Sequence, residues 1–159
     1  MEKEINEQQA LQKLMALCAH GEHSSGEMLE KMRQWHLDEA VQTRLMERLV
    51  TERYVDDERF ARAFVNDKIT YNQWGRRRIE QALWQKGIDP GLRKQVLDEV
   101  DDETYLNVLR PLLKAKARTV KASSDYEHTM KLARFALGRG FSYDLVRRCL
   151  PDAEEMEID

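Results

Sequence analysis

The sequence predicts an all-α protein of three tandem three-helix repeats, which form an elongated, curved array. Three observations support this fold class. First, 7 glycines and 3 prolines among 159 residues, with 35% charged residues, leave few positions that interrupt a helix. Second, apolar residues recur at helical spacing, without a convincing alternation of apolar and polar positions. Third, one apolar pattern returns twice along the chain, which is typical of repeat proteins.

In the first repeat, the apolar spacing predicts helices over residues 8–20, 24–36 and 39–53. Ser24 or Ser25 is suited to cap the second of these helices, and Glu27 can complete a capping box. The chain then turns after Tyr54, where Asp56 or Asp57 is suited to cap the next helix.

The second repeat follows from a shift of 51 residues, which aligns six apolar positions without a gap. The pairs are Met28 with Ile79, Met32 with Leu83, Leu37 with Ile88, Val41 with Leu92, Leu45 with Val96 and Leu49 with Val100. Its helices are predicted over residues 57–70, 74–86 and 89–99. Pro90 fits the start of the last of these, where its missing N–H costs little.

The third repeat follows from a further shift of 53 residues. This shift aligns Ile79 with Leu132, Leu83 with Ala136, Gly87 with Gly140, Ile88 with Phe141, Leu92 with Leu145 and Val96 with Cys149. Helices are predicted over residues 103–121, 126–139 and 142–150, and Pro111 either delays the start of the first of them or kinks it. We place the repeats at 8–55, 56–101 and 102–150, followed by an acidic, flexible tail at 151–159. Each repeat is too small to be secure alone, so neighbours are expected to stack.

Two glycines explain the turn inside the later repeats. Gly87 and Gly140 each follow an apolar helix and precede one hydrophobic residue, which predicts a left-handed residue just past the helix end. The first repeat has His36 at this place, so we expect its helix to end differently.

The composition and the termini predict a cytoplasmic protein without a cofactor. The N-terminus is charged, and no stretch approaches the roughly 18 apolar residues that a membrane span needs. Cys18 and Cys149 lie among apolar helix positions, which favours buried thiols over a disulfide. His20 and His23 lie near Cys18, but no second cysteine pair accompanies them, so zinc is disfavoured.

Charge is distributed in alternating blocks, although the net charge is only −3. Residues 1–58 carry a net charge of −6 and residues 59–88 one of +5. Residues 89–107 then carry −4, residues 108–148 carry +7, and the segment after them carries −5. A protein that coats nucleic acid by charge alone is normally basic overall. The blocks therefore suit a protein that faces acidic and basic surfaces together, or they are merely solvated helix faces.

Three segments go beyond periodicity. They are Tyr54-Val55-Asp56-Asp57-Glu58-Arg59-Phe60-Ala61, Trp74-Gly75-Arg76-Arg77-Arg78-Ile79 and Arg139-Gly140-Phe141-Ser142-Tyr143. In order and spacing, these segments closely resemble the RecX family, the regulators of the recombinase RecA. The resemblance extends over nearly the whole chain, from about Ala10 to Leu150. The sequence departs from the family pattern at His36, where a glycine is typical, and at Arg76–Arg78, where relatives often carry a proline.

The resemblance implies a monomeric regulator that binds the RecA–DNA filament, along its helical groove. It further implies inhibition of filament growth, strand exchange and ATP turnover in recombination and DNA repair. DNA, single- or double-stranded, would be bound weakly or through RecA. The leading alternative is a DNA-binding helical array without a recombinase partner. A purely structural adaptor is a third class, for which we expect a large apolar groove.

The arginine trio Arg76–Arg78 is the strongest candidate for a contact surface. Three cations at a helix N-terminus oppose the helix dipole, which suggests another use, and the helix amides would add to their attraction for phosphate. Each arginine alone is as consistent with a solvated face. The full set of candidates for binding RecA or DNA is Arg62, Lys68, Arg76, Arg77, Arg78, Lys86, Lys114, Lys116, Arg118, Lys121, Arg134, Arg139, Arg147 and Arg148.

Catalysis is not expected, because the sequence contains no phosphate loop, nucleophile elbow or His-Glu-x-x-His motif. The acidic run Asp56–Glu58 lies at a predicted helix start, so we interpret it as capping and not as a metal site. We expect Trp84 to be partly buried in the core and Trp74 to pack.

Overall fold

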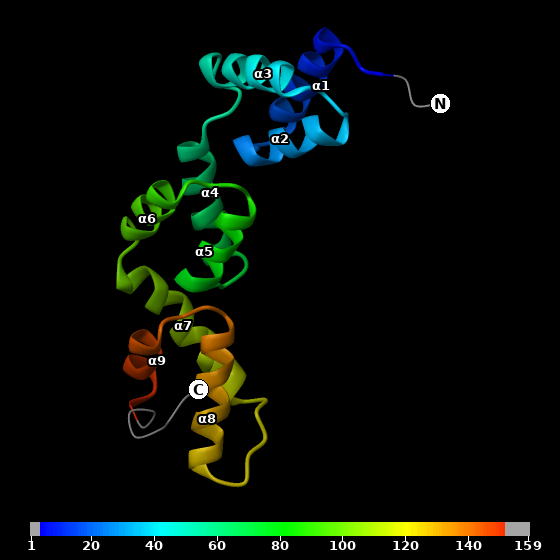
Figure 1. Ribbon diagram of the computed structural model, residues 1–159. Helices are drawn as coiled ribbons and strands as arrows, with labels where there is room; N and C mark the ends of the chain where they lie inside the picture. The colour runs from blue at the N-terminus through cyan, green and yellow to red at the C-terminus, as the bar shows by residue number, and fades with distance from the viewer. Residues whose placement is uncertain (1–3, 152–159) are drawn as a thin grey trace. The chain divides into compact units, whose positions relative to one another are not determined.

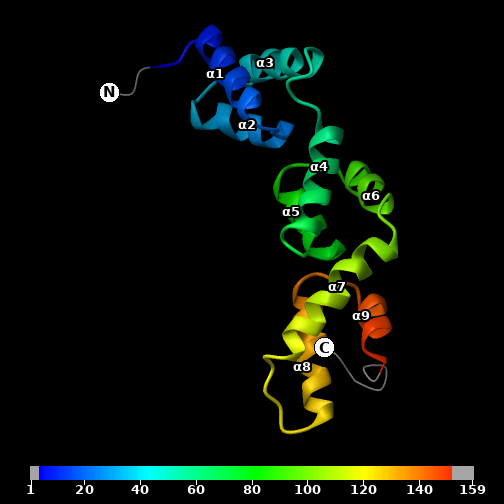
Figure 2. The same ribbon diagram turned by 180° about the vertical axis from the view of Figure 1, so that it is seen from behind.

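The computed structural model describes residues 4–151, and this part of the chain contains nine α-helices and no strand. Figures 1 and 2 show the helices in chain order from two sides. Their bounds are α1 Glu7–His20, α2 Ser25–Gln34, α3 Glu39–Thr51, α4 Asp57–Thr70, α5 Arg76–Gln85, α6 Pro90–Asp98, α7 Asp102–Ala117, α8 Asp125–Gly138 and α9 Tyr143–Cys149. The all-α prediction is confirmed. The acidic tail lies outside the described residues from Asp152 onward.

Contacts divide the chain into two units. The first runs to Ala63 and includes Leu83–Arg93, whereas the second consists of Phe64–Ala82 and the chain from Lys94 onward. Each of the helices α4, α5 and α6 is therefore divided, with one part in the first unit and the other part in the second.

The first unit has a core where α3 packs against both α1 and α2. The core residues are Ala10, Leu11, Leu14, Met28, Met32, Leu45, Leu49 and Val55. Capping boxes fix the starts of α1 and α2, because the side chains of Asn6 and Ser24 each accept a hydrogen bond from the third amide of the helix. Ser24 is therefore the cap, and Asp56 plays this role for α4 by accepting from the amide of Arg59 at 3.0 Å.

The second unit has a core where α7, α8 and α9 pack against one another. Tyr105, Leu106, Leu109 and Leu113 form the buried face of α7. The helix begins at Asp102, with Asp101 as its cap, and continues past Pro111. Pro111 therefore does not delay the start of this helix, and it lies on the exposed side, where a missing hydrogen bond costs least.

The aligned apolar positions of the second helix of each repeat are interior positions. Met28, Ile79 and Leu132 are all buried, as are Met32, Leu83 and Ala136. The periodic pattern therefore located the core face of α2, α5 and α8 correctly.

The turns after α2, α5 and α8 share one backbone geometry. His36, Gly87 and Gly140 all have a positive φ, of 58°, 76° and 95°. In each turn, the amide of the next residue donates to the carbonyl five residues earlier, as in Leu37 to Met32 (3.2 Å), Ile88 to Leu83 (3.1 Å) and Phe141 to Ala136 (3.2 Å). The expectation of a different helix end at His36 is wrong. The hydrogen bonds and the apolar residue beyond the turn hold it in place, despite a cost of about 1–2 kcal/mol for a left-handed L-residue.

Candidate nucleic-acid and partner interface

The predicted contact residues fall into two classes in the structure. Five of them form ion pairs: Arg62 with Glu58 (2.7 Å), Arg76 with Asp98 (2.6 Å), Lys86 with Glu27 (3.4 Å), Arg147 with Asp144 (3.3 Å) and Arg148 with Asp102 (3.3 Å). A cation that is already paired with a carboxylate gains less from a phosphate, because the existing pair must first be opened.

The other nine residues form no ion pair with any carboxylate between residues 4 and 151. They are Lys68, Arg77, Arg78, Lys114, Lys116, Arg118, Lys121, Arg134 and Arg139. We call this set the unpaired cations. All nine belong to the second unit. The structure therefore splits the arginine trio, since Arg76 is paired and its two neighbours are not.

Gly75 sets the position of the two unpaired arginines on α5. Its amide donates to the carbonyl of Arg139 at 2.9 Å, and the amide of Arg77 donates to the carbonyl of Gly140 at 3.1 Å. A Cβ at Gly75 would lie 2.3–2.4 Å from backbone atoms of Gly140 and Phe141. Only glycine allows this approach without a shift of the backbone. We call this contact between residues 75–78 and 139–141 the second junction, because it lies in the second unit.

A groove of about 310 Å³ lies at the second junction. It is lined by Arg77, Arg78, Gln81, Leu137, Gly138 and Gly140. Arg77 and Arg78 are exposed, so their guanidinium groups are accessible to a ligand. The end of α8 brings carbonyls, which carry partial negative charge, to the start of α5. This arrangement offsets the unfavourable effect of arginines at a helix N-terminus.

The two junction amides, however, are not available to phosphate. The amides of Gly75 and Arg77 donate to carbonyls of the α8 turn, so they cannot also hold an anion. The expectation that helix amides would add to phosphate binding is therefore wrong for these two groups. Any attraction at this place comes from the side chains.

Cations also lie over aromatic rings beside this groove. The Lys68 ammonium is 5.2 Å from the centre of the Trp74 ring, and the Arg78 guanidinium is 4.4 Å from the same centre. Arg139, just after α8, and Lys116 of α7 lie 5.4 Å and 4.9 Å from the centre of the ring of Phe135 on α8. Contacts of this kind orient the cations and contribute about 0.5–1 kcal/mol each at exposed sites. Trp74 is half-buried, in agreement with the predicted packing role.

Trp84 differs from its prediction. Its side chain is 64% exposed, whereas the adjacent Leu83 is completely buried. One residue corresponds to a rotation of about 100° around a helix, which is enough to move a side chain from the core to the solvent. Trp84 lines a groove of about 670 Å³ in the first unit, together with residues of α2.

The acidic run at the start of α4 acts structurally. Asp56 caps the helix, and Asp57 accepts a hydrogen bond from the amide of Ser25 at 2.7 Å. Among the described residues, no group of three or more His, Cys, Asp or Glu side chains is placed to hold a metal ion. Burial raises the pKa of the Cys18 and Cys149 thiols, which makes both less reactive.

Known proteins resemble this chain in sequence and in fold. The sequence matches the second three-helix domain of RecX over residues 56–97 and the third over residues 103–150. It is 30% identical to the regulatory protein RecX of Halorhodospira halophila, over 89% of this chain and 86% of that protein. The chain belongs to the RecX family.

Two further RecX relatives define the extent of the match. The regulatory protein RecX of Clostridioides difficile is 27% identical over 89% of this chain, which spans 66% of its length. That of Bacillus cytotoxicus is 24% identical over 96% of this chain, which spans 56% of its length. The chain thus spans less than two thirds of these two relatives.

The fold agrees with a crystal structure of RecX from Lactobacillus salivarius. The TM-score is 0.85 at 18% sequence identity, over 94% of this chain and 97% of that one. The RecX relatives described above are named regulatory proteins. No helix between residues 4 and 151 is long and apolar enough to cross a membrane.

The sequence contained a signal for the cation–aromatic contacts of this RecX chain that the predictions missed. An aromatic residue precedes a cation by four positions at Phe64–Lys68, Trp74–Arg78, Phe135–Arg139 and Tyr143–Arg147, and all four pairs are in contact. Residues four apart are neighbours on a helix surface. This spacing separates three of the unpaired cations from a generic basic face.

Proposed function

We propose that this chain binds the RecA–DNA filament and inhibits filament growth, strand exchange and ATP turnover. Membership of the RecX family, whose relatives are named regulatory proteins, is the observation that supports this proposal most directly. The protein would act as a cytoplasmic monomer in recombination and DNA repair.

We further propose that the unpaired cations contact DNA phosphates. Their support is electrostatic, since a cation without a carboxylate partner binds phosphate without first opening an ion pair. All nine lie in the second unit, whereas the first 58 residues are acidic and would be repelled by phosphate. Protein contacts with RecA would then provide the remaining affinity.

RecA ATPase activity on single-stranded DNA tests the partner. A stoichiometric excess of this chain is expected to slow hydrolysis, with the folded state verified by circular dichroism. An unchanged rate would refute the proposal of a RecA regulator. Tight, salt-sensitive binding to bare DNA together with an unchanged rate would instead support the DNA-binding array without a recombinase partner.

A pair of double variants tests the role of the unpaired cations. Arg77→Gln with Arg78→Gln removes two unpaired charges, whereas Arg147→Gln with Arg148→Gln removes two paired ones. The first double variant should reduce the slope of log affinity against log salt for single-stranded DNA by about 1.4, at roughly 0.7 per phosphate contact. The second changes net charge equally but should leave the slope near its original value. Equal slopes for both would contradict the assignment by ion pairing.

A further inference from the structure

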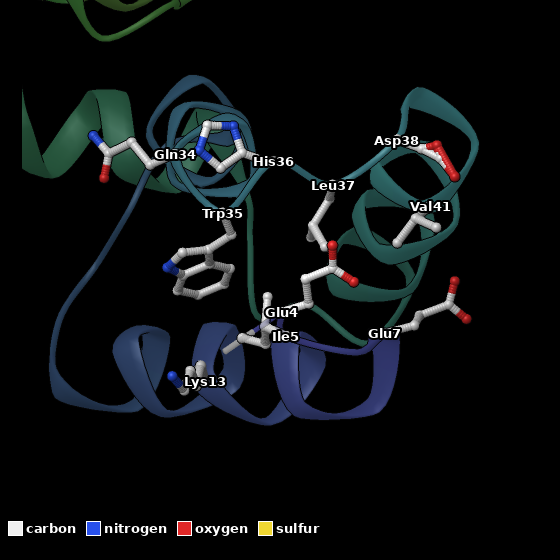
Figure 3. A pocket seen from close by; sticks show the side chains of 10 residues that line it. All are labelled: Glu4, Ile5, Glu7, Lys13, Gln34, Trp35, His36, Leu37, Asp38 and Val41. Carbon is white, nitrogen blue, oxygen red and sulfur yellow. The ribbon is translucent and has the colours of Figure 1, made fainter. Parts of the chain in front are cut away.

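A second candidate surface lies in the first unit, which contains none of the unpaired cations. A pocket of about 900 Å³ opens between the segment before α1, the start of α1, the turn from α2 to α3 and the start of α3. Figure 3 shows its lining side chains, which are Glu4, Ile5, Glu7, Lys13, Gln34, Trp35, His36, Leu37, Asp38 and Val41. All of them belong to the first unit.

The floor of this pocket is apolar. Ile5, Trp35, Leu37 and Val41 pack against the core of the first unit and are only half-buried, so each keeps an accessible face. The left-handed conformation of His36 directs the chain so that the residues on both sides of it line the pocket. An apolar floor of this kind favours a ligand that carries aliphatic or aromatic carbon.

The rim of the pocket is acidic. It carries Glu4, Glu7 and Asp38 against one lysine, Lys13, and Glu7 is already paired with Arg44 at 2.8 Å. Glu4 and Asp38 form no ion pair or side-chain hydrogen bond with the residues that the structure describes. The rim therefore has two carboxylates for which a cation of a ligand would be the first partner.

Asp38 departs from the N-cap residues of five other helices. It occupies the N-cap position of α3, yet its side chain makes no capping hydrogen bond. Asn6, Ser24, Asp101, Ser124 and Ser142 do cap their helices. A capping bond is worth about 1 kcal/mol, so the carboxylate of Asp38 forgoes local stabilisation while it remains at the pocket rim.

We propose that this pocket binds a basic, apolar segment of a partner protein, with an arginine or lysine next to a leucine-like residue. The aliphatic stem of the basic side chain would cover the floor at Trp35, and its charged head would reach Glu4 and Asp38. The Lys13 ammonium lies 5.8 Å from the centre of the Trp35 ring, so the charged head of the ligand would bind beyond it, toward Glu4 and Asp38. The rim carboxylates repel phosphate, which disfavours nucleic acid as the ligand of this pocket.

This inference goes beyond the proposed function and does not depend on it. The proposed function concerns RecA and the phosphate contacts of the second unit, whereas this pocket requires neither. The two proposals therefore fail independently. A lack of peptide binding would not contradict the proposed regulation of RecA, and an unchanged RecA ATPase rate would not contradict peptide binding in this pocket.

Fluorescence anisotropy with the full chain tests the pocket. The probe is a fluorescein-labelled peptide, Arg-Leu-Arg-Leu-Arg, with Glu-Leu-Glu-Leu-Glu as its acidic counterpart and spermine as a competitor without apolar side chains. We expect saturable binding of the basic peptide below about 1 mM, and no binding of the acidic one. Spermine should compete at least about tenfold more weakly than unlabelled basic peptide, because it cannot cover the apolar floor.

Two double variants of equal charge change locate the binding. Glu4→Gln with Asp38→Asn should weaken the basic peptide by about five- to tenfold, in a salt-dependent manner. Glu39→Gln with Glu47→Gln removes two exposed carboxylates of α3 outside this pocket and should change the affinity less than twofold.

Three results would overturn the proposal. The first is an absence of saturable binding, and the second is equal competition by spermine and the basic peptide. The third is an equal effect of both double variants. Sedimentation velocity adds a further test, because a concentration-dependent dimer that disappears with Glu4→Gln and Asp38→Asn would assign the pocket to a second copy of this chain.

Discussion

Gly75 is the residue whose replacement tests the second junction most directly. In a Gly75→Ala variant, the new methyl group would lie 2.3–2.4 Å from the amide nitrogen and Cα of Phe141 and the carbonyl carbon of Gly140. These are backbone atoms that cannot rotate away, so α5 and the α8 turn must separate by about 1 Å to restore ordinary contact. That movement would stretch two hydrogen bonds, of 2.9 Å and 3.1 Å.

The magnitude follows from these two effects. Overpacking of this kind costs about 1–3 kcal/mol, and each weakened hydrogen bond about 0.5–1.5 kcal/mol. A loss of about 2–4 kcal/mol is therefore expected for Gly75→Ala, since the strain and the bond loss partly replace one another. For a chain of this size, the midpoint of thermal unfolding should fall by about 5–15 °C.

Gly138→Ala is the matched control in the same unit. A Cβ at Gly138 meets nothing within 4 Å, and this residue ends α8, where alanine is the better helix former. Its melting temperature should stay the same or rise slightly. Thermal melts followed by circular dichroism measure both, and hydrogen exchange should show the loss of protection in α5 and α8 but not in α1. Equal melting temperatures for the two variants would refute the packing argument.

Four further predictions test other parts of the chain. Gly26→Ala should destabilise the first unit by about 1–3 kcal/mol, measured by urea unfolding, because its Cβ would lie 2.4 Å from the carbonyl oxygen of Lys86. His36→Gly should raise the free energy of unfolding by about 0.5–1 kcal/mol, since glycine adopts a φ of 58° without strain. Trp84→Ala should change it by less than about 0.5 kcal/mol, because that side chain is 64% exposed. Hydrogen bonds from Ser123 lower the pKa of Glu127 to about 2, from 4.5, so the stabilisation is complete above pH 4.5 and lost toward pH 2; melts of Glu127→Gln and the original chain should converge over that range.

Helix positions could be predicted from the sequence because caps and apolar spacing act locally. The helix expected over residues 57–70 is α4 itself, since an acidic cap precedes it and its apolar residues follow the helical period. The C-terminal turns at Gly87 and Gly140 were predicted for the same reason, because a left-handed glycine is a local requirement. His36 was mispredicted because residue type alone does not reveal how strongly the following hydrogen bonds and apolar contact hold a turn.

Contacts between distant residues could not be predicted in this way. Gly26 lies within a helix, where glycine is locally unfavourable. A glycine is required there because the backbone of Lys86 and Gly87, sixty residues later, leaves no room for a Cβ. The pairing of Arg76 with Asp98 likewise depends on packing, so Arg76 could not be distinguished from Arg77 by sequence alone. The basic character of the candidate surface was therefore predictable, but the availability of each cation was not.

One contact is built twice, once in each unit, and this explains how charge can vary without loss of the fold. In the first unit, the hydroxyl of Ser24 donates to the carbonyl of Lys86 at 2.7 Å, and Gly26 lies against Gly87. In the second unit, the aligned residue Gly75 donates through its amide to the carbonyl of Arg139.

Both contacts depend on backbone atoms, a glycine and a small hydroxyl, and on no long side chain. The positions beside them are therefore free to differ, and they do: Glu27 in the first unit aligns with Arg78 in the second. Glu27 is occupied by its capping box and by Lys86, whereas Arg78 forms no ion pair within residues 4–151. Because the junctions are held by the backbone, reversing the charge at Arg78 should alter binding far more than stability. The contribution of Arg78 to stability and its proposed contact with phosphate are thus separable by experiment.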